Sequence, residues 1–112
     1  MGNAKNDQLL GSLDLLVLRV LAAAAQPLHG YAITERIQTC SDDMLRVEEG
    51  SLYPALHRMD EASWVASEWG LSENNRRARY YRITSKGRRR LAALEKHWAQ
   101  HVQAVNRVLR EA

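Results

Sequence analysis

Side chains suited to nucleic-acid contact crowd into residues 49–61. They supply hydroxyl, phenol, pyrrolidine, imidazole and guanidinium groups, in the order Ser51, Tyr53, Pro54, His57 and Arg58. When the N-terminus of a helix enters a major groove, such groups meet base edges and phosphates. The segment therefore predicts a DNA recognition helix. The alternative is an ordinary surface helix with a proline near its start.

The same segment carries an apolar stripe with helical spacing. Its members recur at i, i+3, i+4 and i+7: Leu52, Ala55, Leu56 and Met59. This pattern predicts an amphipathic helix with one face on a small core. Gly50 or Ser51 is the expected N-cap. Pro54 then falls within or just beyond the first turn, where a missing backbone N–H is tolerated.

A cationic block lies between positions 74 and 90. It contains no acid and half of the chain's 16 lysine and arginine residues: Arg76, Arg77, Arg79, Arg82, Lys86, Arg88, Arg89 and Arg90. Tyr80, Tyr81 and Ile83 interrupt the block with residues typical of strands, so the charge is expected on a fixed surface. The predicted partner is a polyanion, and a solvated charge run is the alternative.

Two further helices and a loop are expected upstream, at residues 12–25, 31–40 and 41–48, with a turn at 26–30. Ser12 is the expected cap of the first helix, and Asp14 suits the dipole in its first turn. That helix is apolar almost all round, so part of it is expected to meet another subunit. His29 in the turn is expected to be a hydrogen-bonded structural residue. The order of elements indicates a helix-turn-helix unit with a long loop.

Two runs rich in aromatic and β-branched residues, at 64–69 and 79–83, predict a β-hairpin. The polar segment 70–78 joins them and carries Asn74, Asn75, Arg76 and Arg77. Arginines at such a tip suit a phosphate backbone or a narrow minor groove. The predicted fold is therefore mainly α with a small β-hairpin, a winged helix-turn-helix.

A long amphipathic helix closes the chain, capped by Thr84 or Ser85 and running to about Arg110. At 1.5 Å per residue it spans roughly 38 Å, more than a wing-sized domain covers. Its apolar stripe comprises Leu91, Leu94, Trp98, Val102, Val105 and Val108 or Leu109. This stripe predicts a homodimer, in which Leu13 and Leu16 of the first helix also take part.

The predicted organisation is an arm at 1–11, a DNA-binding domain at 12–84 and a dimerisation helix at 85–112. Cations crowd the start of the last helix, where the dipole disfavours them, so phosphate contact is expected from Lys86 in particular.

Other classes of function have little support. Cys40 is the only cysteine, so no intrachain disulfide can form, and a packing role in a cytoplasmic protein is expected. The apolar run 13–25 is too short to cross a bilayer, so no membrane partner is expected. His97 and His101 stand i, i+4, but only Glu95 could complete a ligand set, so neither metal nor cofactor is expected. No segment of the sequence contains a nucleophile together with a general base and a residue to orient that base. We therefore expect that the protein is not an enzyme.

Several blocks of sequence, in order, carry a resemblance to a known family: GSLDLLVL at 11–18, LHGY at 28–31, GSLYPALHR at 50–58, EWG at 68–70 and NNRRARYY at 74–81. From about residue 11 to 98 the chain resembles the PadR-type transcriptional regulators. The resemblance implies a winged helix-turn-helix dimer that binds a palindromic operator in double-stranded DNA. It implies a repressor that is released by a small molecule or another signal.

The resemblance also implies roles for single residues. It places Tyr53, His57 and Arg58 on the recognition helix, Asn75, Arg76 and Arg77 on the wing, and Trp98 on the dimerising helix. Some multidrug-binding relatives hold flat ligands between paired tryptophans at that interface. Trp98 is therefore a candidate for a small planar effector, with a place in the dimer core as the alternative.

One position departs from the family pattern. Ser63 stands where members commonly have glycine, just before the first strand of the wing. If that position needs a positive φ, serine costs on the order of 1 kcal/mol.

Three hypotheses follow from the sequence. The first is a dimeric DNA-binding repressor, the second a small-molecule sensor centred on Trp98, and the third a protein-interaction module with a winged-helix shape. Loss of DNA affinity on replacing Arg76 and Arg77 by alanine separates the first from the third.

Overall fold

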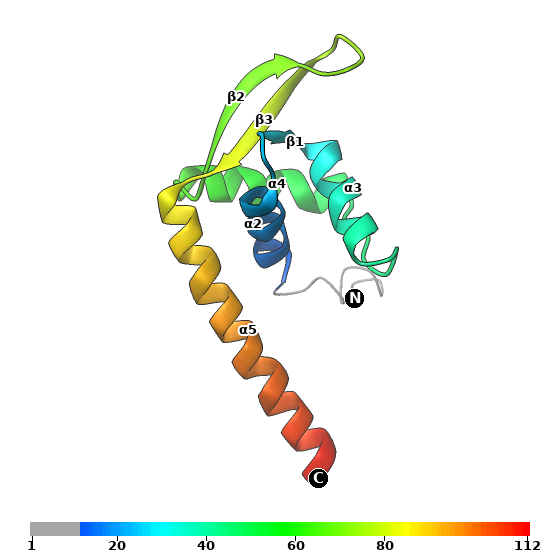
Figure 1. The fold of residues 1–112 in the computed structure, drawn as a ribbon, viewed down its shortest axis with the longest axis vertical. Helices are drawn as coiled ribbons and strands as arrows, with labels where there is room; N and C mark the ends of the chain where they lie inside the picture. Colours follow the sequence, from blue (N-terminus) through cyan, green and yellow to red (C-terminus); the bar gives the residue numbers. More distant parts are fainter. Residues whose placement is uncertain (1–11) are drawn as a thin grey trace.

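The computed structural model describes residues 12–112. Its elements follow one another as α2 (Leu13–Ala23), β1 (Leu28–His29), α3 (Gly30–Cys40), α4 (Glu49–Glu61), β2 (Val65–Leu71), β3 (Arg77–Ile83) and α5 (Ser85–Glu111). Helices α2, α3 and α4 cluster beside a projecting hairpin, and α5 runs away as a long rod (Figure 1). The winged-helix prediction is confirmed. The arm expected at 1–11 lies outside the described residues.

The core forms around α2, where its apolar side chains meet those of α3, α4, the hairpin and the start of α5. All four stripe positions predicted on α4 are buried, namely Leu52, Ala55, Leu56 and Met59. On α2, Val17 and Leu18 are completely buried, whereas Leu13 and Leu16 are only partly covered. Because the stripe of α4 faces inward, its polar positions must face out.

The first helix ends earlier than predicted. It stops at Ala23 rather than Ala25, because Ala24 already has an extended backbone with ψ 137°. Cys40 was expected to pack inside the domain, and that expectation is wrong. The side chain is exposed at the end of α3, since the last buried residue of that helix is Ile37, one turn earlier.

A third strand occupies part of the segment predicted as a plain turn. Strand β1 pairs antiparallel with β3, with Leu28 opposite Tyr81 and His29 opposite Tyr80, so the sheet has the order β1-β3-β2. Two residues are too few to show the alternation by which strands are recognised in a sequence. The expectation of a bare two-stranded hairpin is therefore corrected.

The hairpin itself is longer than predicted. Strands β2 and β3 pair from Val65 with Ile83 out to Leu71 with Arg77, and only 72–76 forms the loop. The strands and this loop together are called the wing. Polar residues near the predicted tip thus belong to strands, which gives their side chains defined faces.

The turn from α4 into the wing uses the left-handed backbone suspected from the sequence. Ser63 has φ 65°, and it follows the C-cap residue Ala62. The Ser63 N–H donates to the Asp60 carbonyl (2.9 Å) and the Trp64 N–H donates to the Met59 carbonyl (2.9 Å). This is the hydrogen-bond pattern of a Schellman motif, which favours glycine at the position of Ser63.

The Ser63→Gly variant is therefore expected to raise the free energy of unfolding by about 1 kcal/mol, since glycine adopts this backbone without a Cβ clash. Urea unfolding followed by circular dichroism measures the change. Ser63→Ala is the control, because it keeps the Cβ and should bring no gain. An unchanged midpoint for the glycine variant would show that φ 65° carries no measurable strain.

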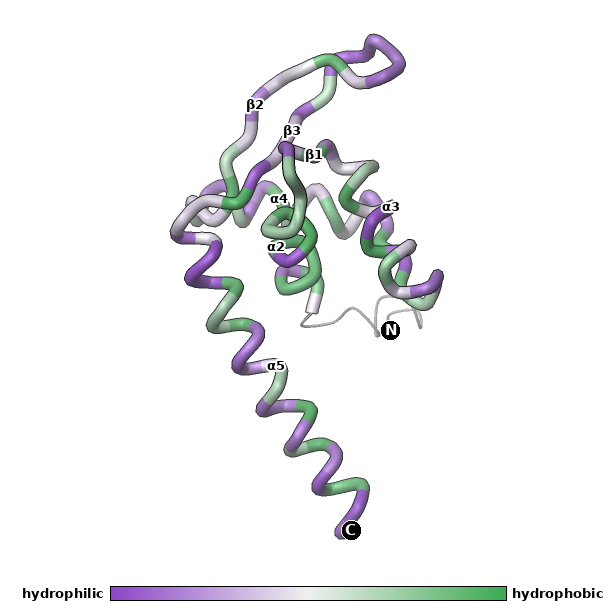
Figure 2. The backbone as a smooth tube through the Cα atoms, in the orientation of Figure 1, coloured by the Kyte–Doolittle hydropathy of each residue, from purple (hydrophilic) through white to green (hydrophobic). Residues whose placement is uncertain are grey.

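Helix α5 begins where the sequence predicted but leaves most of its length uncovered. Thr84 caps it, and its Oγ1 accepts from the Gly87 N–H (2.9 Å). Beyond Leu94, the apolar side chains stay open to solvent within one chain, from 37% exposed at Val102 to 75% at Leu109. Figure 2 shows apolar positions recurring along this isolated rod. In the described part of the chain, no helix is both long and apolar enough to span a membrane.

Candidate nucleic-acid interface

Helix α4 presents the residues singled out in the sequence. Tyr53, Pro54, His57 and Arg58 are exposed, and Ser51 is half-buried. The helix starts earlier than predicted, because the Glu48 carbonyl accepts from both the Ser51 and Leu52 N–H groups (3.0 Å each), which makes Glu48 the N-cap. The N-cap prediction of Gly50 or Ser51 is thus wrong. Pro54 consequently lies inside the helix, in its second turn.

Arg58 has a partner that the sequence did not reveal. Its two terminal nitrogens donate to the two carboxylate oxygens of Asp14 on α2, at 2.7 and 3.0 Å. The hydrogen bond to Asp14 raises the pKa of Arg58 above its ordinary value. A bidentate pair of this kind has well-defined geometry. Asp14, expected only to suit a helix dipole, therefore ties α2 to α4 through one of the residues predicted to contact DNA.

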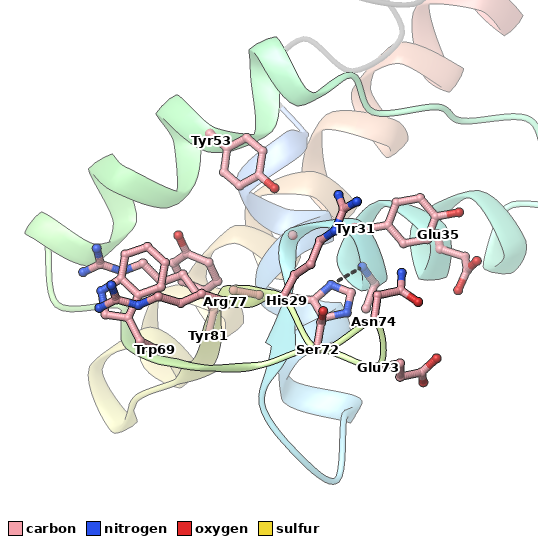
Figure 3. Close-up of a pocket in the computed structure, with 15 residues that line it drawn as sticks. His29, Tyr31, Glu35, Tyr53, Trp69, Ser72, Glu73, Asn74, Arg77 and Tyr81 are labelled. Carbon is pink, nitrogen blue, oxygen red and sulfur yellow. Dashed lines mark hydrogen bonds between the residues drawn. The ribbon is translucent and has the colours of Figure 1, made fainter.

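A cleft of about 800 Å³ lies between the wing and the start of α3, and Tyr53 of α4 also lines it. Its lining includes residues from α4, from β1 and α3, and from the wing: Tyr53, His29, Tyr31, Glu35, Trp69, Glu73, Asn74, Arg76, Arg77 and Arg79. Figure 3 shows Tyr53 reaching toward this space from α4, with Trp69 and Arg77 on the opposite side. The structure thus brings together Tyr53, Asn74, Arg76 and Arg77, which are far apart in the sequence. Ser51, Pro54, Arg58, Asn75 and Lys86 do not line this cleft.

Tyr53 occupies this position because residue 30 is glycine. A Cβ on Gly30 would lie 2.6 Å from the Tyr53 hydroxyl and 2.9 Å from the ring. Contacts this short do not occur between real atoms of these kinds, so any larger residue would displace the phenol. The glycine of the LHGY block therefore places Tyr53 against the N-terminus of α3.

His29 holds the start of α3, as expected of a structural residue. Its Nδ1 accepts a hydrogen bond from the Ala32 N–H (3.2 Å), and its ring meets Tyr80 of β3 edge-on with centroids 5.4 Å apart. The prediction of a hydrogen-bonded structural role is confirmed. The sequence offered no sign that His29 would also line the cleft.

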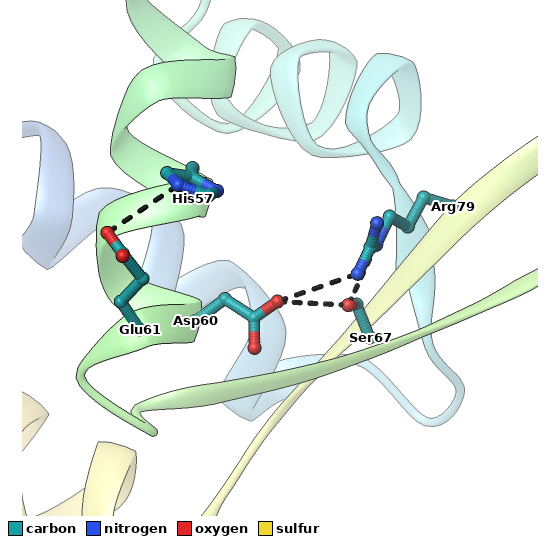
Figure 4. Close-up of polar contacts among 5 residues, drawn as sticks. All are labelled: His57, Asp60, Glu61, Ser67 and Arg79. Atoms are coloured by element: carbon teal, nitrogen blue, oxygen red, sulfur yellow. Dashed lines mark hydrogen bonds and ion pairs between the residues drawn. The ribbon is translucent and has the colours of Figure 1, made fainter.

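The base of the wing is attached to the end of α4 by a polar network (Figure 4). The Ser67 hydroxyl donates to Asp60 Oδ2 (3.2 Å), and Arg79 Nε donates to the Ser67 hydroxyl (2.9 Å). Arg79 also lies 3.8 Å from the Asp60 carboxylate. Asp60 therefore partly balances the charge of Arg79 within the domain. In the sequence, Arg79 belongs to a cationic block without acidic residues. Burial raises the pKa of the neighbouring Tyr81 phenol, although the Arg79 charge opposes that shift.

His57 faces a smaller hollow of about 370 Å³ beside this network. Its Nε2 lies 3.5 Å from Glu61, one turn later, and both side chains are largely exposed. A pair this exposed holds the imidazole only weakly, so His57 remains free to contact another molecule.

The far half of α5 lies outside the hydrophobic core of the single chain. Trp98 is 44% exposed, and its ring lies tilted against His101 with centroids 5.9 Å apart. Within residues 12–112, no cluster of three or more His, Cys, Asp or Glu side chains could hold a metal ion.

Comparison with known proteins connects this arrangement to a family. Over residues 17–93 the sequence matches the family described as Transcriptional regulator PadR-like family. A transcriptional regulator from Clostridium thermocellum superposes with a TM-score of 0.80 at 27% identity, covering 90% of this chain and 96% of that one. A PadR family regulator from Eggerthella lenta gives 0.77 at 29% identity, covering 95% and 88%. Uncharacterized protein X of Lysinibacillus sphaericus is 28% identical over 86% of each chain. The chain therefore belongs to the PadR-like family of transcriptional regulators.

Proposed function

We propose that this regulator is a repressor that binds a palindromic operator as a homodimer. Membership of a family of transcription regulators implies DNA binding. The observation that supports DNA binding by these residues is the shared cleft, which Tyr53 of α4 lines together with Arg76 and Arg77 of the wing. A helix for the major groove and a cationic hairpin for the adjacent backbone or minor groove are the two parts by which such a domain grips a duplex. Residues 12–84 form the proposed DNA-binding domain.

The homodimer is proposed from the uncovered side chains of α5. Trp98, Val102 and Val105 are 44, 37 and 42% exposed, and they lie on one stripe of a helix that extends beyond the rest of the domain. A second copy would cover them, with residues 85–112 as the dimerisation helix and Leu13 and Leu16 at its edge. Because two-fold symmetry relates the copies, the recognition helices would read half-sites about 34 Å apart.

The proposed release signal is a small planar molecule held at Trp98. The indole is partly open and already packs against His101, so a flat ligand could extend the ring stack. In the homodimer this position would lie between the two copies, where a ligand changes the spacing of the recognition helices. Quenching of tryptophan fluorescence by flat aromatic cations, absent in Trp98→Leu, supports this role. An identical response from the variant contradicts it.

The proposal is tested by salt titrations on an operator fragment that the purified protein selects from random duplexes. Wild-type affinity should fall steeply with salt, because each neutralised phosphate contributes a slope of about 0.9 in log K against log salt. In the proposed homodimer, replacing both Arg76 and Arg77 by alanine removes two phosphate contacts from each copy. The slope should therefore fall by about 3.6, and binding should weaken by about tenfold or more at moderate salt.

The matched control replaces Arg107 and Arg110 by alanine. These arginines are 72 and 68% exposed at the end of α5 farthest from the wing, and the change in charge is the same. This control should keep the full salt slope. A wild-type protein that binds no duplex, or wing and control variants that behave alike, would favour a protein-interaction module instead.

A further inference from the structure

The guanidinium groups of two arginines lie over the indole ring of Trp69, on the face of the wing that borders the cleft. The Arg77 guanidinium lies 4.4 Å and the Arg79 guanidinium 5.5 Å from the centre of the indole. The strand register explains the arrangement, since Trp69 pairs directly with Arg79 and Arg77 is the diagonal neighbour on the same face. Trp69 is nevertheless 54% exposed, so burial in a core does not explain its place.

The two arginines differ in what else they contact. Arg79 is bound to Ser67 and lies beside Asp60, which draws it toward the base of the wing. Arg77 takes part in none of the ion pairs formed among residues 12–112. Its guanidinium lies over the indole ring, and the donors of a guanidinium point outward in one plane, in a geometry that suits a phosphate.

We propose that Trp69 is a positioning residue for DNA binding, which holds the Arg77 guanidinium in the orientation that meets a backbone phosphate. The inference rests on the proposed DNA-binding function. Stacking on the indole restricts the rotamers of Arg77 before DNA arrives, so less freedom is lost on binding. Trp69 itself neutralises no phosphate, because it is uncharged.

The strand end that bears Trp69 is braced from the other face of the hairpin. The Tyr80 hydroxyl donates to the Leu71 carbonyl (3.0 Å), and its ring crosses Gly70, where an added Cβ would lie 3.0 Å from a ring carbon. The glycine of the EWG block thus makes room for this brace. A fixed backbone at 69–71 is what a positioning role for Trp69 needs.

The test measures operator binding by fluorescence anisotropy over a salt series. Trp69→Leu keeps apolar bulk but removes the π face, and should weaken binding about three- to fivefold with an unchanged salt slope. Arg77→Ala removes one phosphate contact from each copy of the proposed homodimer, so it should weaken binding and also lower the slope by about 1.8. Trp69→Leu added to Arg77→Ala should have no further effect, whereas Trp69→Tyr should restore most of the affinity.

Leu71→Ala is the matched control, since Leu71 lies directly opposite Arg77 and is 67% exposed. It should bind as the wild type does. Equal affinity for Trp69→Leu and the wild type would overturn the positioning role. Additive losses from Trp69→Leu and Arg77→Ala would also overturn it, because they would mean that the indole touches DNA by itself. A wild type that binds no DNA would refute the proposed function instead.

Discussion

Replacing Val102 by glutamate is expected to separate the protein into monomers and to weaken operator binding by about a hundredfold or more. Val102 is the least exposed of the large apolar residues in the free half of α5, at 37%, and it lies between Trp98 and Val105 on the stripe. A carboxylate there would have to be buried without a partner when two copies pack together. A monomer binds only one half-site. It therefore loses the gain in affinity from the second half-site, which is typically a factor of about 10²–10⁴.

Light scattering at several protein concentrations measures the assembly, and anisotropy on the same samples measures operator affinity. The control is Gln103→Glu, which adds the same charge at the next position, on the exposed polar face of α5. It should remain dimeric and bind normally. If the Val102→Glu protein remained a dimer of wild-type affinity, α5 would not be the dimerisation helix.

Replacing Gly87 by alanine is expected to lower the free energy of unfolding by about 3 kcal/mol. An added Cβ would lie 2.0 Å from the Trp64 carbonyl oxygen and 2.8 Å from Ile83 Cγ1. The closer contact is with backbone, which cannot rotate away, so α5 must move from the wing. That movement strains the cap, in which Thr84 Oγ1 accepts from the Gly87 N–H and donates to the Ser63 carbonyl.

Urea unfolding of the wild type and of Gly87→Ala measures this difference in the free energy of unfolding directly. Gly50→Ala is the matched control, because a Cβ at Gly50 in helix α4 would meet no atom within 4 Å. Gly50 is the second residue of α4, in its first turn, so this variant should gain no more than the roughly 0.5–1 kcal/mol that alanine brings in a helix interior. Two alanine variants of equal stability would mean that the close approach at Gly87 is relieved without cost.

The amphipathic helices could be predicted from the sequence because helical periodicity is a local property. Leu52, Ala55, Leu56 and Met59 are buried as their spacing indicated, and the stripe from Trp98 onward lies on one face of α5. The hairpin could be predicted because its strands are neighbours in the chain. The residues proposed to contact DNA could also be named from the sequence, since their chemical types and the family blocks identify them.

The tertiary structure alone decided which of these residues meet. Asp14 binds Arg58 across 44 positions, and strand β1 exists only because β3 passes beside it. Contacts of this kind depend on how elements approach through space, and no periodicity within one segment encodes them. Local pattern therefore determined that α4 and the wing would carry polar and cationic faces. Packing determined that Asp14 binds Arg58 and that Arg77 lies over the ring of Trp69.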